Sequence, residues 1–235
     1  MILSKIRALL TIIQMVITVT ITIIIMYMFP KHTKKFRQLW AKMQLKLLGI
    51  TLEVEGEVDQ NATMQLMNHQ SVLDIIIFEY YEQKNSAWVA KKEIADIPWF
   101  GRILKAPDMI IIERESKSSL VQLIKDVKEK LGQNRPIFMF PEGTRGRGDK
   151  LLKFKPGAKI VAEKYSLLVQ PVVIVGTRDI LDSQNLIQKS GVVKVIYLPT
   201  IQAKRKTTWY DECEAQMKLA LDTEIKKVKE IEEQI

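Results

Sequence analysis

The stretch Asn68-His69-Gln70-Ser71-Val72-Leu73-Asp74 combines an imidazole with a carboxylate five positions later, and the 235 residues contain only one other histidine. Residues 63–67 have the composition of a short strand and residues 74–81 that of an apolar helix, which predicts a strand-to-helix turn at His69. Asp74 could accept a hydrogen bond from one imidazole nitrogen and leave the other free as a base. A turn histidine followed by a first-turn helix charge would have the same spacing, so the pair alone leaves both interpretations open.

A glycine-rich loop is the second candidate for chemistry. It has the sequence Phe140-Pro141-Glu142-Gly143-Thr144-Arg145-Gly146-Arg147-Gly148 and follows a predicted strand at residues 137–140. Backbone amides of such a loop can approach an anion, and Arg145 can bind a phosphate through two parallel hydrogen bonds. Asp149 stands where an ATP-binding loop has lysine, and Leu151 where a dinucleotide loop has glycine. The loop therefore predicts a phosphate site at which ATP and NAD are disfavoured, with a flexible, solvated loop as the alternative.

Other positive groups follow the predicted strands. Lys91 and Arg114 each end a strand-like run, and Lys155 and Gly157 open the helix predicted after the glycine-rich loop. Ligands of α/β sheets bind at the carboxyl ends of strands, and a helix N-terminus attracts anions. Each group alone is typical of a solvated surface, but several around one histidine favour an anionic substrate.

The composition describes an ordered protein with an excess of positive charge. Hydrophobic residues make up 47% of the chain and charged residues 27%, and the formal net charge is +9. These values favour a folded core and an anionic partner such as a nucleic acid, a phosphorylated substrate or an acidic membrane. A single cysteine, Cys213, excludes an internal disulfide, and with two histidines no ordinary metal site can be built from His and Cys. A magnesium site made of carboxylates stays open.

Residues 1–48 are predicted to anchor the protein to a membrane. The run from Ala8 to Phe29 is apolar, carries no charge and is long enough to cross the ~30 Å hydrocarbon core as a helix. It is longer than the apolar part of a signal peptide, and no small-residue cleavage site follows. Its polar residues recur at helical spacing, which permits a span but also suits a helix packed on a partner or lying shallowly in the bilayer. These residues are Thr11, Gln14, Thr18 and Thr22.

Residues 31–48 predict a basic amphipathic helix. Its apolar stripe consists of Phe36, Leu39, Trp40, Met43 and Leu47, and its charges are Lys34, Lys35, Arg37, Lys42 and Lys46. Such a helix suits the membrane interface, with Trp40 at headgroup level and the lysines directed toward acidic phosphates, although the stripe could instead pack on the globular domain. Because the positive charge follows the apolar run, the globular part is expected in the cytoplasm.

From residue 49 onward, strand-like runs alternate with helical ones. This alternation predicts an α/β domain, residues 49–235, with a central mixed, largely parallel sheet of about seven strands flanked by helices. The strands are expected near residues 52–55, 65–67, 87–90, 109–113, 137–140, 169–175 and 192–198, and two of the helices at 117–131 and 155–165. A C-terminal amphipathic helix begins at Trp209, and its apolar face is formed by Cys213, Met217, Leu221, Ile225 and Val228.

Four ordered blocks resemble those of the glycerolipid acyltransferases, over roughly residues 30 to 200. Asn68 to Asp74 is similar to the family's NHx4D motif, and Phe140 to Arg145 to its FPEGTR motif. Lys91 to Arg114 and Val169-Gln170-Pro171-Val172 are similar to the second and fourth blocks, and the bacterial 1-acyl-glycerol-3-phosphate acyltransferases are the nearest group. One departure is Asp108, which stands where the family often has glycine, six residues before the arginine, and this puts the local turn geometry in doubt.

The resemblance implies acyl transfer to the sn-2 hydroxyl of lysophosphatidic acid, giving phosphatidic acid. The donor would be acyl-coenzyme A or acyl-carrier protein, with direct attack, no acyl-enzyme and no cofactor. His69 would be the general base, oriented by Asp74, and Asn68 or backbone amides could stabilise the oxyanion. The glycerophosphate site would comprise Lys91, Arg114, Glu142, Gly143, Thr144 and Arg145. The expected location is the cytoplasmic face of the bacterial inner membrane, with a phospholipid surface and no nucleic acid as partner.

Other functions stay open at this stage. Within the family, the acceptor could be glycerol 3-phosphate, another lysophospholipid or an aminolipid. A membrane phosphohydrolase would also use a basic pocket, but without a metal cluster it would need a covalent nucleophile. A serine hydrolase is disfavoured because the sequence has no G-x-S-x-G. A non-enzymatic lipid-binding protein would explain the N-terminus and the charge, but not the pairing of His69 with Asp74.

Overall fold

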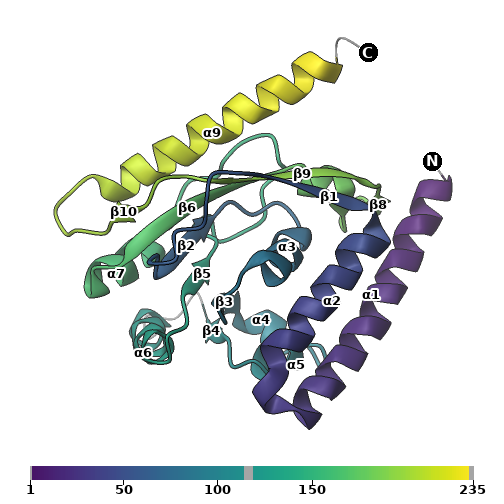
Figure 1. Cartoon of the computed structure of the whole chain (residues 1–235), viewed down its shortest axis with the longest axis horizontal. Helices are drawn as coiled ribbons and strands as arrows, with labels where there is room; N and C mark the ends of the chain where they lie inside the picture. Colours follow the sequence, from purple (N-terminus) through teal and green to yellow (C-terminus); the bar gives the residue numbers. More distant parts are fainter. Residues whose placement is uncertain (1, 114–118, 233–235) are drawn as a thin grey trace.

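The computed structural model describes residues 2–113 and 119–232, which form a three-layer α/β domain with a helical hairpin at its N-terminus (Figure 1). The main sheet has the strand order β1-β9-β6-β2-β5-β3-β4, and β10 pairs with β6. The strands are β1 (Ile50–Glu55), β2 (Met64–Met67), β3 (Ala87–Lys91), β4 (Ile110–Ile112), β5 (Ile137–Met139), β6 (Leu168–Val175), β9 (Gly191–Tyr197) and β10 (Ile201–Gln202). Pairs β6-β9 and β6-β10 are antiparallel and the others are parallel, which confirms the predicted mixed, largely parallel sheet.

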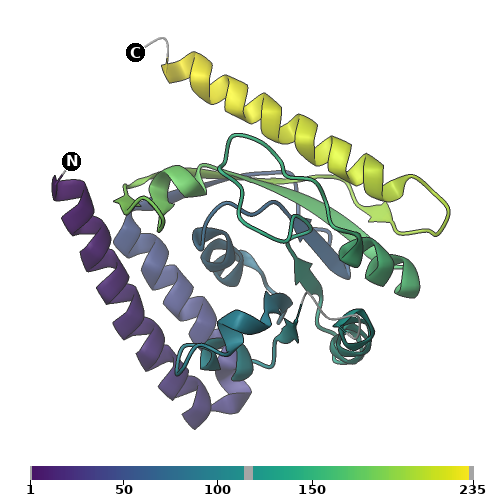
Figure 2. The same ribbon diagram turned by 180° about the vertical axis from the view of Figure 1, so that it is seen from behind.

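The strands bury both faces of the sheet, since neighbouring side chains point to opposite sides. In β6, Val173 faces a core shared with α6 (Ser119–Gly132), α7 (Pro156–Tyr165) and α9 (Trp209–Glu232). Val172 and Ile174 face a second core, shared with α2 (Thr33–Leu48) and α3 (Leu73–Tyr81). Helix α9 therefore lies on the opposite side of the sheet from the N-terminal helices (Figure 2).

The C-terminal helix begins at Trp209, as predicted. Cys213, Met217 and Leu221 on its apolar face are fully buried, and Ile225 packs at the margin of the core. Val228 is 46% exposed, so the predicted face is buried only in the first part of the helix. The sequence patterns did not predict several short elements. These are the two-stranded sheet of β7 (Leu181–Asp182) and β8 (Ile187–Gln188) and the one-turn helices α4 (Lys92–Ala95), α5 (Arg102–Lys105) and α8 (Thr177–Ile180).

The N-terminal hairpin consists of α1 (Ile2–Met28), a 3₁₀ turn η1 (Pro30–His32) and α2. Its residues 5–28 are long and apolar enough to cross a membrane, and only a small part of this segment is buried inside the protein. The polar stripe of α1 faces α2, because Thr18 Oγ1 accepts hydrogen bonds from Trp40 Nε1 at 3.1 Å and Gln44 Nε2 at 3.0 Å. The sequence left open whether the stripe packs on another helix, and in the structure it packs on α2.

Helix α2 packs on the domain through a different face from the predicted stripe. Its buried residues are Thr33, Arg37, Ala41, Gln44, Leu45 and Leu48. Leu39 and Leu47 of the stripe remain more than half exposed, so the stripe does not cover the globular domain. The prediction that Arg37 lies among the surface charges is wrong. Arg37 is buried in an ion pair with Glu79 of α3, and its Nη2 donates to Asn85 Oδ1 at 2.7 Å.

Candidate active site

His69 lies on the turn between β2 and α3, as the sequence predicted. Its Nδ1 is 2.7 Å from Asp74 Oδ2, and Asp74 is fully buried in the first turn of α3. A carboxylate at this distance holds the proton on Nδ1, so Nε2 is the unprotonated nitrogen. The imidazole is partly exposed, with 13% of its side-chain surface accessible. This geometry is that of an oriented general base.

Three further donors fix the Asp74 carboxylate. Oδ2 accepts the backbone N–H groups of Gln70 at 2.6 Å and Ser71 at 2.9 Å, and Oδ1 accepts the hydroxyl of Thr177 at 2.6 Å. Thr177 is fully buried at the start of α8, 103 residues further along the chain. Sequence reasoning missed it, because a threonine after a strand carries no signal for such a distant partner.

Aromatic side chains stack against the imidazole of His69. The ring of Phe140 stacks on His69 with centroids 3.8 Å apart and planes 11° apart. Trp88 of β3 stacks in turn on Phe140 at 5.4 Å, and its indole N–H donates to Glu79 Oε1 at 2.8 Å. The plane of the base is thus set by packing as well as by Asp74.

Asn68 has a structural role. Its side chain accepts the N–H of Ile174 at 2.7 Å and donates to the carbonyl of the same residue at 2.8 Å, which ties the end of β2 to β6. The side chain is buried and its amide is engaged, so it is not available as an oxyanion donor in this arrangement. Backbone amides remain the other group proposed for that role.

Glu142 braces the histidine turn. Its buried carboxylate accepts the N–H of His69 at 2.7 Å through one oxygen and the N–H of Leu152 at 2.8 Å through the other. Both oxygens are therefore occupied by backbone donors, whereas the sequence prediction counted Glu142 among the phosphate contacts. Burial raises the pKa of this carboxyl to about 7; the two N–H donors lower it, and the Asp74 carboxylate raises it further.

The remaining phosphate candidates lie around this turn. Gly143 has φ +73°, which favours glycine, and exposed Thr144 and Arg145 follow it on the same loop. Lys91 ends β3 at a half-buried position. Arg114 lies outside the described residues. Among those that are described, the loop and the end of β3 meet at the carboxyl edge of the parallel strands, where ligands of α/β sheets bind.

Asp108 resolves the question raised by the missing glycine. Its φ is +55°, a left-handed conformation that glycine adopts freely and aspartate tolerates better than most residues. Its carboxylate forms an ion pair with buried Lys130 of α6. Asp108 thus adopts, in the turn before β4, a backbone conformation that glycine would also allow.

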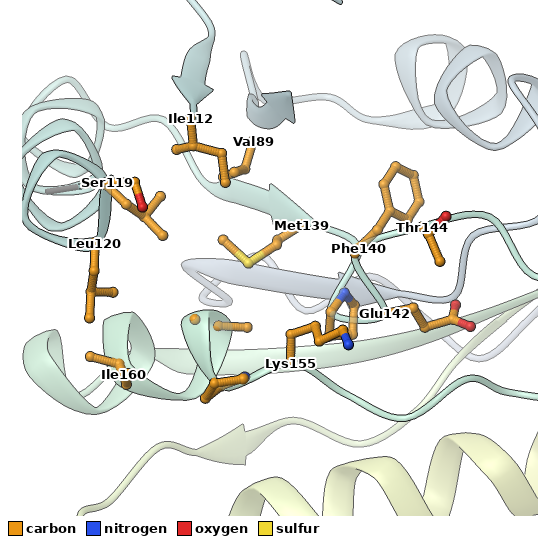
Figure 3. Close-up of a pocket in the computed structure, with 16 residues that line it drawn as sticks. Val89, Ile112, Ser119, Leu120, Met139, Phe140, Glu142, Thr144, Lys155 and Ile160 are labelled. Carbon is orange, nitrogen blue, oxygen red and sulfur yellow. The ribbon is translucent and has the colours of Figure 1, made fainter. Parts of the chain in front are cut away.

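An apolar cavity of about 770 Å³ adjoins the site. Hydrophobic side chains of β3, β4, β5, α6 and α7 form most of its wall: Val89, Ile112, Leu120, Leu123, Met139, Ala158 and Ile160. Glu142, Thr144 and Lys155 lie at one end of it, with Phe140 beside them, while Ser119, Leu120 and Ile160 lie at the other (Figure 3). Phe140 thus borders the cavity and also stacks on His69. Among the described residues, no group of three or more His, Cys, Asp or Glu side chains could hold a metal ion.

Known proteins are similar to this chain in sequence and in fold. Residues 51–175 match the family model described as Acyltransferase. The 1-acyl-sn-glycerol-3-phosphate acyltransferase of Helicobacter pylori is 44% identical over 173 residues, which is 73% of each chain. The protein of that name from Escherichia coli is 29% identical over 180 residues, 75% of this chain and 72% of its own. The crystal structure of PlsC, the 1-acyl-sn-glycerophosphate acyltransferase of Thermotoga maritima, has the same fold. Its TM-score is 0.74 over 96% of this chain and 98% of its own, at 23% identity.

Glu142 makes stability depend on pH in a defined direction. Because its pKa is raised from 4.5 to about 7 on folding, it stabilises the fold fully below pH 4.5, and this contribution is lost as the pH rises to about 7. The loss is on the order of 3 kcal/mol. Glu142→Gln removes the titration, so the free energy of unfolding of the wild type should fall relative to the variant over this interval, measured by urea denaturation in detergent.

The exposed Glu93→Gln serves as the control, and its stability should follow the wild type at every pH. If the curves of the wild type and Glu142→Gln ran parallel between pH 4.5 and 7, the raised pKa would be refuted.

Proposed function

The chain belongs to the acyltransferase family, and from this we propose that it transfers an acyl group from an acyl-thioester to the sn-2 hydroxyl of 1-acyl-glycerol 3-phosphate, giving phosphatidic acid. The observation that carries the proposal is the pairing of His69 Nδ1 with Asp74, which leaves Nε2 as a base beside the glycine-rich loop. The donor would be acyl-coenzyme A or acyl-carrier protein.

In the proposed step, His69 Nε2 removes the proton of the acceptor hydroxyl as its oxygen attacks the thioester carbonyl. The tetrahedral intermediate collapses with cleavage of the C–S bond, and the imidazolium returns the proton to the thiolate. A thioester is already activated, so a positioned base can suffice without an acyl-enzyme, a metal or another cofactor. Asp74 stabilises the imidazolium, and its buried, four-donor setting keeps it in place.

The phosphate of the acceptor would bind where the positive groups gather. Arg145 is exposed on the loop after β5, and Lys91 ends the neighbouring strand β3. Gly143 and Thr144 offer backbone and hydroxyl donors, and Arg114 would complete the set. Glu142 would serve this site indirectly, by fixing the loop to His69.

The apolar cavity fits an acyl chain. Its hydrophobic walls would bury methylene groups, at about 0.8 kcal/mol for each. Its polar end includes Glu142, which accepts the His69 N–H at 2.7 Å, so a chain in the cavity could place its carbonyl near His69.

We propose that the N-terminal hairpin lies in one leaflet on the cytoplasmic side of the cell membrane. Two points of α1, about four turns apart, are bonded to the globular domain: Arg7 Nη2 donates to Ser190 Oγ at 3.0 Å, and Thr20 Oγ1 accepts from Trp99 Nε1 at 3.1 Å. A helix held along the domain in this way is better suited to a shallow position than to a perpendicular span. Exposed Lys35, Lys42 and Lys46 of α2 would face acidic headgroups.

His69→Ala is expected to lower acyl transfer by ~10²- to 10⁴-fold while folding and vesicle binding persist, because it removes the base alone. The assay supplies purified protein with lysophosphatidic acid and a panel of acyl-thioesters, and resolves the products by mass. Parallel reactions with glycerol 3-phosphate and other lysophospholipids test the alternative acceptors.

His32→Ala is the matched control, since His32 is the other histidine and is exposed in η1. It should retain wild-type activity. Full activity of His69→Ala would rule out this mechanism, and a wild-type protein that acylates none of the acceptors would rule out the function.

Thr177 is expected to act by positioning Asp74. Thr177→Val removes the donor to Oδ1, leaves that buried oxygen unpaired and should lower kcat by about ten-fold with little change in KM. Thr177→Ser keeps the hydroxyl and should restore most of kcat. Equal losses in the two variants would assign Thr177 a packing role instead.

Arg145→Ala is expected to raise KM for lysophosphatidic acid by about 10- to 100-fold, the loss expected for charge-assisted hydrogen bonds to phosphate. KM for the acyl donor should stay unchanged. Arg147→Ala, which removes the same charge two residues further along the exposed loop, is the control. A change confined to the acyl donor would show that Arg145 binds the donor.

A further inference from the structure

The loop at residues 97–100, between α4 and α5, exposes three large apolar side chains. Ile97 is 47% exposed, Trp99 42% and Phe100 37%. Contiguous apolar side chains of this size on a soluble surface mark an interaction site. The neighbouring charged groups are exposed Asp96, Arg102 and Lys105, so the loop margin is net positive.

The loop is held in one conformation that keeps Trp99 outward. Its backbone is closed by hydrogen bonds from Gly101 N to Ile97 O at 2.9 Å and from Arg102 N to Trp99 O at 3.0 Å. Trp99 has φ +64°, which is unfavourable for a bulky residue and persists only where the surroundings enforce it. A Cβ at Gly101 would lie 2.0 Å from the carbonyl oxygen of Ala95, so the close approach requires glycine.

The loop and the helix that follows it also contact α1. The indole N–H of Trp99 donates to Thr20, and Ile103 of α5 packs against Val19 and Ile23. Helix α2 binds α1 through Thr18. At 100° per residue, Thr18 and Thr20 are 200° apart around the helix, so α2 and the loop hold opposite sides of α1.

The outward arc of α1 between these two contacts is apolar. Ile17, Ile21 and Ile24 lie on it and are 45–55% exposed. Helix α1 is the outermost element on this side of the molecule (Figures 1 and 2). The exposed isoleucines of α1 therefore lie between its contact with α2 and its contact with the 97–100 loop.

We propose that the 97–100 loop is a third membrane-contacting element, which inserts Ile97, Trp99 and Phe100 into the headgroup boundary of an acidic bilayer. This inference rests on the proposed membrane position of α1 and α2, and the loop is bonded to α1. Tryptophan suits this boundary because its ring is apolar and its N–H polar. The Arg102 guanidinium lies 4.9 Å from the Trp99 ring centroid, where it can also meet lipid phosphates.

Docking of the loop would set the height of the site above the bilayer. Only the single turn of α4 separates Lys91, at the end of β3, from the loop, and β4 follows α5 directly. Insertion of the loop would thus hold the strand ends that carry the proposed phosphate site near the lipid headgroups. An acceptor phosphate could then reach Lys91 while its acyl tail stays in the membrane.

The test places an environment-sensitive nitrobenzoxadiazole label at position 100, using Phe100→Cys in a Cys213→Ala background. Vesicles of phosphatidylcholine and phosphatidylglycerol carry nitroxide groups in their acyl chains. The label should shift to shorter wavelength and be quenched several-fold more than one at Leu219→Cys. Leu219 is 71% exposed on α9, on the other side of the sheet.

The variant Ile97→Ser/Phe100→Ser should bind these vesicles about ten-fold more weakly, whereas Leu219→Ser binds as the wild type does. An unquenched label at position 100 in vesicle-bound protein would overturn the proposal. A shift of its emission to shorter wavelength without vesicles, together with the mass of a dimer, would also overturn it and assign the loop to contact with a second copy. These binding measurements involve no acyl transfer, so failure of the proposed enzymatic function would leave their outcome unaffected.

Discussion

The buried carboxylate of Asp74 is the constraint around which the site is built. A charge without solvent is tolerated only if donors surround it, and Asp74 receives four: the imidazole, two amides of its own turn and the Thr177 hydroxyl. Satisfying it fixes the β2–α3 turn and the start of α8 relative to each other. The orientation of His69 is therefore a consequence of how the sheet and two helices pack.

A second buried charge, on Glu79, connects the N-terminal hairpin to the site around His69. Glu79 of α3 pairs with Arg37 of α2 and accepts the indole N–H of Trp88. Trp88 stacks on Phe140, and Phe140 on His69, so contacts run without a gap from the proposed membrane helix to the base. Removing one partner of a buried pair usually costs 3–5 kcal/mol, which makes detachment of α2 unfavourable. The hairpin is thus part of the folded domain.

Local patterns predicted most of the fold and the elements of the site. Each of the seven expected strands is observed, and His69 and Asp74 pair as their spacing suggested. What escaped prediction depends on distant partners. Periodicity assigned Arg37 to the surface because it cannot detect the distant partner Glu79, and Thr177 meets Asp74 only in the folded protein, from 103 residues along the chain. Asp108 has a left-handed backbone conformation that the residue type does not signal, whereas a glycine would have.

The end of β5 brings the three requirements of the proposed reaction together. Met139 lines the apolar cavity, Phe140 stacks on the base, and Gly143 to Arg145 lie on the loop proposed to bind phosphate. Successive side chains of a strand point to opposite faces, so Met139 and Phe140 can serve the cavity and the base at once. A shift of one residue in register would exchange these two faces and destroy both functions. Pairing of β5 with β2 and β3 on both sides prevents that shift, so catalytic geometry here depends on the register of a three-residue strand.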